Sequence, residues 1–290
     1  MPRVLIAGCG YVGKATAELF QTAGWKVECW TATAGTAAGL EREGFVTQAV
    51  DIGNRDAVAA AASDFEVVLQ CASSGGGSVE AYRHVYLAGA RNLAAVFPRT
   101  LLLFTSSTSV YAQTDGEWVT EESEANPQRE TGRILRESEE VVLAAGGVVA
   151  RLAGIYGPGR SALLRKFLDG TAVLDPASDR FINQAHRDDI AAALLLLAQR
   201  YAGQSQPASE TISLIYNVSD NDPISQHDCY AWLAGKLNRP LPREVPTQLE
   251  RKRGRSNKRV SSEKLQALGW QPRYPSFASG MSESILPSLK

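Results

Sequence analysis

The sequence has few residues of the kinds that build metal sites, and no excess of charge. Its 290 residues include three histidines, four cysteines and two methionines, and 30 basic side chains face 31 acidic ones. Cys9, Cys29, Cys71 and Cys229 are far apart and form no CxxC pair, so we expect no metal site and expect cysteines that pack as small apolar residues. A net charge of −1 gives no general attraction to nucleic acid or to an anionic membrane.

Long hydrophobic runs are also missing. The leucine run at 194–197 is far too short to span a bilayer, and the first apolar run ends in glycines before it reaches the length of a signal peptide. We therefore expect a soluble cytoplasmic protein with neither a nucleic-acid nor a membrane partner.

Glycine, in contrast, forms a spaced motif near the N-terminus. An apolar strand at 4–7 leads into Gly8-Cys9-Gly10-Tyr11-Val12-Gly13, and a helical segment follows. In a dinucleotide-binding turn of this form, the first glycine permits the tight turn and the second lets a pyrophosphate approach the backbone. The third lets the helix pack closely on the strand, while the helix N-terminus attracts the phosphates. The alternative is a glycine-rich loop without a ligand.

Strands and helices alternate along the first half of the chain, which predicts an α/β fold: a Rossmann-type, doubly wound parallel sheet covered by helices on both faces. The pattern predicts strands at 4–7, 26–30, 45–49, 67–71, 101–104 and 148–150, with a late strand at 214–218. It predicts helices at 14–23, 35–43, 54–62, 79–97, 132–144, 188–199 and 225–237.

The alternation becomes irregular after Leu152, where Pro, Gly and short strands are more frequent. We therefore expect a dinucleotide-binding domain at 1–152 and a smaller, mixed substrate-binding lobe at 153–290. The two are interleaved, because the helix at 188–199 is apolar enough to return to the main sheet.

Further segments resemble the extended short-chain dehydrogenase/reductase family, also called the NAD-dependent epimerase/dehydratase family. The segments that carry the resemblance run in the family's order along nearly the whole chain, and they are 51–52 (DI), 71–73 (CAS), 106–112 (SSTSVYA), 151–159 (RLAGIYGPG), 186–190 (HRDDI), 216–218 (YNV) and 268–272 (LGWQP). The resemblance places Asp51 and Ile52 against the adenine of the cofactor. It places Cys71, Ala72 and Ser73 near the ribose and nicotinamide. It places Ser107 at the family's Ser/Thr, whose hydroxyl bonds the substrate; the equal alternative is a serine that bonds the backbone at a strand end.

The catalytic centre departs from the family pattern. Family members carry a Tyr with a Lys four residues later, and often a Glu four residues after that. Alignment on Glu139 puts Thr131 at the Tyr position and Leu135 at the Lys position, and no YxxxK occurs anywhere in the chain. A positioned acid or base contributes roughly 10²–10⁴-fold in rate, so the ordinary mechanism requires a substitute. The chain thus resembles atypical family members that lack this Tyr.

Four residues are candidates for that substitute. Tyr156 is the first choice, because the family resemblance puts its turn near the nicotinamide. Tyr111, His186 and Arg133 are the other candidates. A structural role is the favoured alternative for all four: packing with a bonded hydroxyl for the two tyrosines, a backbone bond near the helix start at 188 for His186, and a solvated helix end for Arg133. Thr108 and Ser109 stand where sugar-nucleotide dehydratases carry an Asp-Glu pair, which disfavours dehydration.

The cofactor is NAD or NADP, and the sequence leaves the choice open. Thr31 occupies the end of the second strand, where an acidic residue would favour NAD and a nearby Arg would favour NADP. A basic run at 251–255 continues to Lys258 and Arg259, and it either holds an anionic substrate or is a solvated loop.

Two functions follow from these observations. The first is an NAD(P)-dependent oxidoreductase or epimerase that acts on a nucleotide-sugar-like or carbonyl/hydroxyl small molecule with a non-standard acid. The second is a catalytically inactive dinucleotide-binding protein that senses redox state or serves as a scaffold. The resemblance also implies a homodimer formed through the helices at 79–97 and 132–144.

Overall fold

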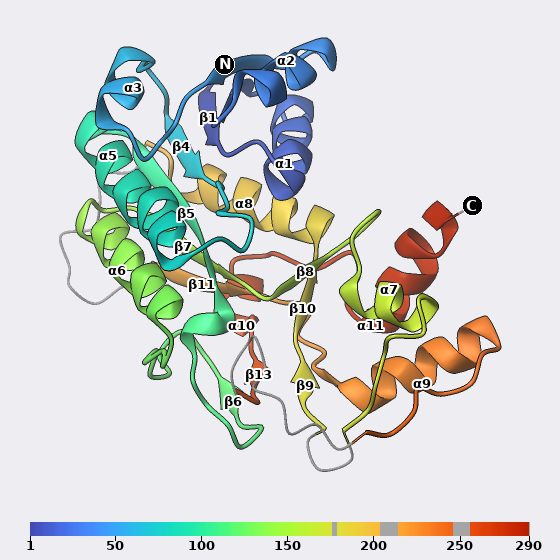
Figure 1. Cartoon of the computed structure of the whole chain (residues 1–290). Coiled ribbons are helices and arrows are strands. Elements are labelled where there is room, and N and C mark those ends of the chain that lie inside the picture. The colour runs from blue at the N-terminus through green and yellow to red at the C-terminus, as the bar shows by residue number, and fades with distance from the viewer. Residues whose placement is uncertain (176–178, 204–213, 246–255, 290) are drawn as a thin grey trace.

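A seven-stranded parallel sheet forms the centre of the molecule (Figure 1). The computed structural model describes residues 1–175, 179–203, 214–245 and 256–289. The strand order is β11-β7-β5-β4-β1-β2-β3, and every pair is parallel. The strands are β1 Arg3–Ala7, β2 Lys26–Thr31, β3 Val46–Ala49, β4 Val67–Gln70, β5 Leu101–Ser107, β7 Val148–Leu152 and β11 Ile215–Val218. The order reverses between β1 and β4, which is the switch point where doubly wound sheets bind ligands.

Successive residues of the central strands enter opposite cores. In β1, Val4 and Ile6 join one apolar cluster, whereas Leu5 and Ala7 join the other, and all four are fully buried. Because side chains alternate across a strand, a strand covered on both faces needs mostly apolar residues on both of its sides. This requirement explains the continuous apolar runs in the sequence.

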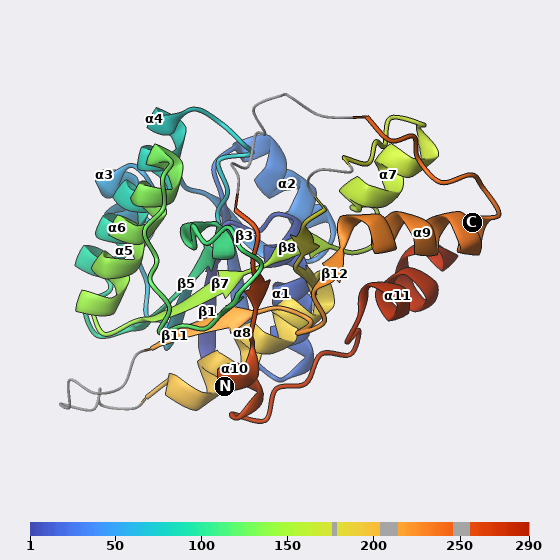
Figure 2. The same cartoon turned by 90° about the horizontal axis from the view of Figure 1, so that it is seen from below.

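Helices cover both faces of the sheet (Figures 1 and 2). One cluster contains residues of α1, α2 and α8, and α1 packs along α8. The other contains residues of α3, α5 and α6. The bounds are α1 Tyr11–Thr22, α2 Ala34–Arg42, α3 Arg55–Ala60, α5 Gly89–Val96, α6 Glu130–Ala144 and α8 Arg187–Tyr201. The expected Rossmann-type fold is confirmed.

A smaller apolar cluster lies to one side of the sheet, built from chain beyond residue 155. Its helical elements are α7 Ala162–Leu168, α9 Gln226–Leu237, α11 Phe277–Gly280 and the π-helical turn η3 Met281–Ile285, and the 3₁₀ turn η4 Pro287–Leu289 follows η3. Two short strand pairs form separate two-stranded sheets: β8 Gly154–Tyr156 with β10 Gln184–His186, and β9 Phe181–Ile182 with β12 Ile224–Ser225. The domain boundary at residue 152 stays a prediction.

Several elements differ from the sequence-based expectation. The single helix expected at 79–97 consists of α4 Val79–Tyr82, the π-helical segment η1 Arg83–Ala88 and α5. The pair β6 Trp118–Val119 with β13 Arg259–Val260, the 3₁₀ turn η2 Thr108–Val110 and α10 Glu263–Gln266 were not expected. Across the described ranges, none of the helices has the length and apolar character needed to cross a bilayer.

Candidate functional site

The glycine turn between β1 and α1 is shaped by its own backbone. Gly8 has a φ of +109°, and a Cβ on it would lie 2.1 Å from the backbone nitrogen of Ala72. A Cβ on Gly13 would lie 2.3 Å from the carbonyl oxygen of Gly8. Neither space can hold a methyl group, so the first and third glycines bring β1, β4 and α1 together.

Gly10 is different, because a Cβ on it would meet nothing within 4 Å. It is the N-cap of α1, and no side chain caps the helix there. The first turn of α1 therefore presents its backbone N–H groups to open space. A hollow at this point is lined in part by Cys9, Gly10, Tyr11, Lys14 and Arg187. An uncapped helix N-terminus behind a bare glycine fits a phosphate group.

The residues expected at the adenine end lie at the edge formed by β2 and β3. Thr31 is buried, and its hydroxyl donates to the carbonyl of Thr33 at 3.2 Å. The Asp51 carboxylate is half exposed and accepts hydrogen bonds from the Gly53 N–H and from Nε2 of His84, each at 2.9 Å. Ile52 is buried among the apolar residues on this face.

The segment after β4 lies directly against the glycine turn. The Cys71 N–H donates to the carbonyl of Ala7 at 2.8 Å, and the Ala72 backbone closes on Gly8. Burial raises the pKa of the Cys71 thiol to about 12, so the thiol stays neutral near pH 7. The Ser73 hydroxyl accepts from the Gly75 N–H at 3.2 Å. Gly8 and the Cys71–Ala72 backbone are thus in contact, while the ligand-binding roles of all these residues stay predictions.

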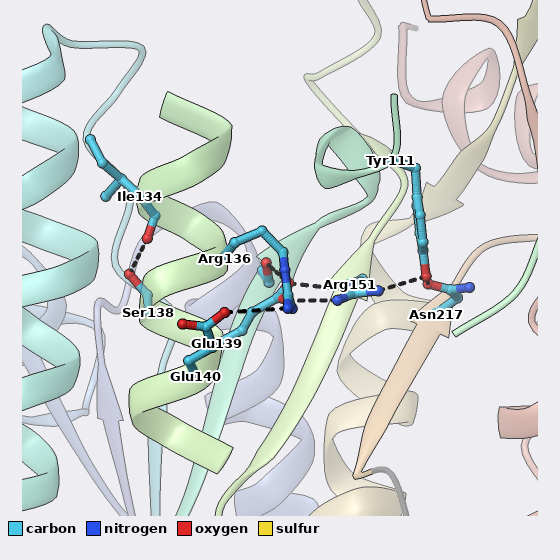
Figure 3. Close-up of polar contacts among 9 residues, drawn as sticks. Tyr111, Ile134, Arg136, Ser138, Glu139, Glu140, Arg151 and Asn217 are labelled. Carbon is cyan, nitrogen blue, oxygen red and sulfur yellow. Dashed lines mark hydrogen bonds and ion pairs between the residues drawn. The ribbon is translucent and has the colours of Figure 1, made fainter. Parts of the chain in front are cut away.

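A buried polar network lies beneath the carboxyl ends of β5, β7 and β11 (Figure 3). Arg151 donates to both carboxylate oxygens of Glu139, at 3.0 and 2.7 Å, and to the Tyr111 hydroxyl at 2.9 Å. The Tyr111 hydroxyl in turn donates to Asn217, and the Ser106 hydroxyl donates to Glu139 at 2.6 Å. Arg136 also pairs with Glu139. Tyr111 therefore has a structural role. Its buried hydroxyl is hydrogen-bonded to Arg151 and Asn217, which makes it unsuited to proton transfer.

The residues at the expected catalytic positions lie beside this network. Ser107 is the last residue of β5, is partly exposed, and its hydroxyl accepts from the Ser109 N–H at 3.1 Å. Thr131 is partly buried near the start of α6, and Leu135 is 4% exposed within an apolar cluster. Arg133 is exposed and donates to the carbonyl of Gln128. Leu135 therefore packs among apolar side chains.

Tyr156 ends β8 and points into the small apolar cluster. It is 1% exposed, and a Cβ on Gly280 would lie 2.1 Å from its hydroxyl oxygen. Burial raises the pKa of this phenol, with the nearby carboxylates Asp220 and Asp189 adding to the effect, so the group stays protonated. The tyrosine ring meets His186 edge-on, at 5.2 Å between centroids. Its catalytic role stays a prediction.

Lys258 and Arg259, at the end of the basic run, donate hydrogen bonds to backbone carbonyls of the protein. Lys258 is 7% exposed and donates to the carbonyl of Tyr111 at 2.9 Å, and burial lowers its pKa to about 8. Arg259 donates to the carbonyl of Gly116 at 2.6 Å and stacks on Trp118 and Phe181. These two residues stabilise the β6–β13 region, and residues 251–255 lie outside the described part of the chain.

Two arginines that the sequence did not single out gather on Tyr11 of the glycine turn. The guanidinium carbons of Arg160 and Arg187 lie 5.2 and 5.1 Å from the centre of the Tyr11 ring. Arg160 directly follows the Tyr156–Gly159 turn, and Arg187 begins α8. Arg160 directly follows the family-like segment 151–159 and Arg187 lies within the segment 186–190, but neither segment indicated a contact with the glycine turn.

The fold and this glycine turn define a dinucleotide-binding α/β protein of the Rossmann type. The family model of the NAD dependent epimerase/dehydratase family matches residues 4–218, and the chain belongs to that family. No curated protein sequence matches the chain.

Solved structures resemble the chain over almost its full length. One from Methylobacillus flagellatus, provisionally described as an NAD-dependent epimerase/dehydratase, is 28% identical with a TM-score of 0.72, and 96% of each chain is covered. UDP-glucose 4-epimerase of Thermus thermophilus, solved with NAD, is 21% identical with a TM-score of 0.76 and 96% coverage of each chain. dTDP-glucose 4,6-dehydratase of Bacillus anthracis, also solved with NAD, is 16% identical with a TM-score of 0.78, covering 98% of this chain and 95% of that one.

Proposed function

We propose that the protein is an NAD(P)-dependent oxidoreductase or epimerase that acts on a nucleotide-sugar-like or carbonyl/hydroxyl small molecule. The observation that carries the proposal is the bare, uncapped turn at Gly10 and the α1 N-terminus. Family membership and the NAD-containing neighbours support the same cofactor class.

The chain's own residues account for cofactor binding. The backbone N–H groups of Tyr11, Val12 and Gly13 would hold the pyrophosphate, while Asp51 and Ile52 would hold the adenine. Cys71, Ala72 and Ser73 would border the ribose on the nicotinamide side. When bound, the nicotinamide would supply hydride transfer. Thr31 is neutral and favours neither NAD nor NADP.

Ser107 and Tyr156 are the residues proposed to contact the substrate and to transfer the proton. Ser107 is partly exposed at the end of β5, where it can bond a substrate oxygen. Tyr156 can serve as the acid only if the small lobe moves and uncovers its hydroxyl, since Gly280 now packs against it.

One observation favours a second candidate, a non-catalytic dinucleotide-binding protein. Leu135 is 4% exposed in an apolar cluster, so the position that holds a Lys in the family has no donor here. A protein of this kind would bind the cofactor and change its contacts with a partner protein.

Calorimetric titration of the cofactor-free protein with NAD⁺, NADH, NADP⁺ and NADPH tests the shared part of both candidates. We expect one pair to bind with a Kd in the micromolar range or tighter. Binding of none of the four would overturn the proposal.

A panel of carbonyl compounds and nucleotide sugars, followed at the absorbance band of the reduced nicotinamide and by product analysis, then separates the candidates. Turnover of any member supports the enzyme, because an epimerase changes the product even when the absorbance is steady. Binding without turnover supports the second candidate.

A further inference from the structure

Tyr11 joins the glycine turn to the turn that follows β8. Its hydroxyl donates to the carbonyl of Pro158 at 3.0 Å. The turn from Gly157 to Arg160 is closed by two backbone hydrogen bonds of 3.0 and 2.9 Å. A Cβ on Gly157 would lie 2.5 Å from the Tyr11 hydroxyl, so glycine is needed for this contact.

Two cations share the ring of this one tyrosine. Arg160 is exposed and has no ion pair to another described residue, while Arg187 is partly buried and its Nε bonds Asp188 at 2.9 Å. The ring attracts each guanidinium. Both guanidiniums are positively charged, and Asp188 pairs with Arg187.

Tyr11, the residue that both arginines contact, lies in the glycine turn at the carboxyl end of β1. α1 and α8 pack along each other, and both begin at the carboxyl ends of their preceding strands, β1 and β10. Arg187 lines the hollow that runs from the α1 N-terminus along its first two turns, together with Gly10, Tyr11, Lys14 and Glu18. An anion bound by the first turn of α1 would lie within reach of Arg187.

We propose that Arg160 and Arg187 form the cationic side of the diphosphate-binding site, so that the bound dinucleotide ties the 157–160 turn to the glycine turn. This inference rests on the proposed function. A diphosphate carries two negative charges, and arginine binds phosphate oxygens through two parallel N–H donors. The backbone of α1 would contact one side of the diphosphate and the two side chains the other.

The test compares two probes, ADP-ribose and adenosine, because only ADP-ribose contains the diphosphate. The variants are Arg160→Gln, Arg187→Gln and the double variant. Arg200→Gln is the matched control, since Arg200 stacks on Tyr201 at 5.7 Å near the opposite end of the same helix. Arg187→Lys keeps the charge and removes the two-pronged donor.

We expect each single variant to weaken ADP-ribose about 10-fold and the double variant about 100-fold, with adenosine binding unchanged and the control equal to the wild type. Arg187→Lys should fall between the wild type and Arg187→Gln. The dependence of ADP-ribose affinity on salt should also be shallower in the double variant, because fewer charges are neutralised.

Three outcomes would overturn the inference. If the double variant binds ADP-ribose as tightly as the wild type, this inference is overturned and the proposed function is not. Equal losses for ADP-ribose and adenosine would show a general disturbance of the site, which also contradicts a diphosphate role. Failure of the wild type to bind ADP-ribose would overturn the proposed function and this inference with it.

Discussion

Three glycines in one turn have different physical tasks. Gly8 and Gly13 are required by the protein's own backbone, since a Cβ on either would overlap main-chain atoms at 2.1 and 2.3 Å. Gly10 faces open space, so its missing side chain matters only when a ligand arrives. The two tasks can be separated by substitution.

Gly10→Ala should leave stability nearly unchanged but weaken dinucleotide binding at least 10-fold, because its methyl group would occupy the space that a pyrophosphate needs. Gly13→Ala should instead lower the free energy of unfolding by about 1–3 kcal/mol through overpacking. Urea denaturation and calorimetry measure the two effects. A Gly10→Ala protein that binds NAD(H) as tightly as the wild type would refute the assignment of this turn.

The sequence predicted the glycine turn because three glycines at fixed spacing after a short apolar strand form a local pattern. It did not reveal Arg160 and Arg187, which stand 149 and 176 residues beyond Tyr11 in the chain. The packing of α1 against α8 brings Arg187 to the turn, and the hydrogen bond from Tyr11 to Pro158 places the turn that carries Arg160 beside it. Surface arginines are common, so their type alone carries no such signal.

At the scale of the element, α8 depends on a histidine cap. The Asp188 N–H donates to Nδ1 of His186, so Nδ1 carries no proton, and Nε2–H donates to the Ser284 hydroxyl at 2.9 Å. Burial lowers the pKa of His186 to about 4. Protonation of Nδ1 would remove the acceptor that caps α8.

The free energy of unfolding should therefore fall as the pH drops from about 6.5 toward 4. The unfolded chain takes up a proton on this histidine near pH 6.5, whereas the folded protein resists protonation until about pH 4. Urea titrations between pH 4 and 7 test this, with His186→Asn as the comparison because Asn can also cap a helix. An equally steep pH dependence in both proteins would contradict the role given to His186.

Elements with a local sequence pattern could be predicted, whereas elements that depend on contacts between distant residues could not. The seven central strands and α1 were predicted from local apolar patterns. The π-helical segment η1 was not, because the 79–97 pattern suits one continuous helix. The β6–β13 pair could not be predicted either, since it joins Trp118 to Arg259 with only two residues per strand.

At the scale of the whole molecule, the Glu139–Arg151 pair links the sheet to its helical cover. Arg151 belongs to β7 and Glu139 to α6, and the network continues through Tyr111 to Asn217 on β11. Both members of the pair are almost fully buried. Removing one charge would leave the other buried without its partner.

Glu139→Gln should lower the free energy of unfolding by about 3–5 kcal/mol, because Arg151 would lose its buried counter-charge. Glu140→Gln is the matched control: Glu140 is 66% exposed and pairs with Arg136, and its loss should cost less than about 1 kcal/mol. Urea denaturation measures both. Equal losses of unfolding free energy in the two variants would show that the Glu139–Arg151 pair contributes no more to stability than a surface ion pair.

The position of β11 at the edge of the sheet has a consequence for synthesis. The six other central strands are complete when residue 152 has been made, but β11 ends at residue 218 and α8 lies between them. At about 5–20 residues per second, the ribosome needs several seconds for that stretch. During this interval the outer edge of β7 and the face that α8 will cover remain open on the nascent chain. We expect newly made protein to be most exposed to chaperones and to aggregation in this interval.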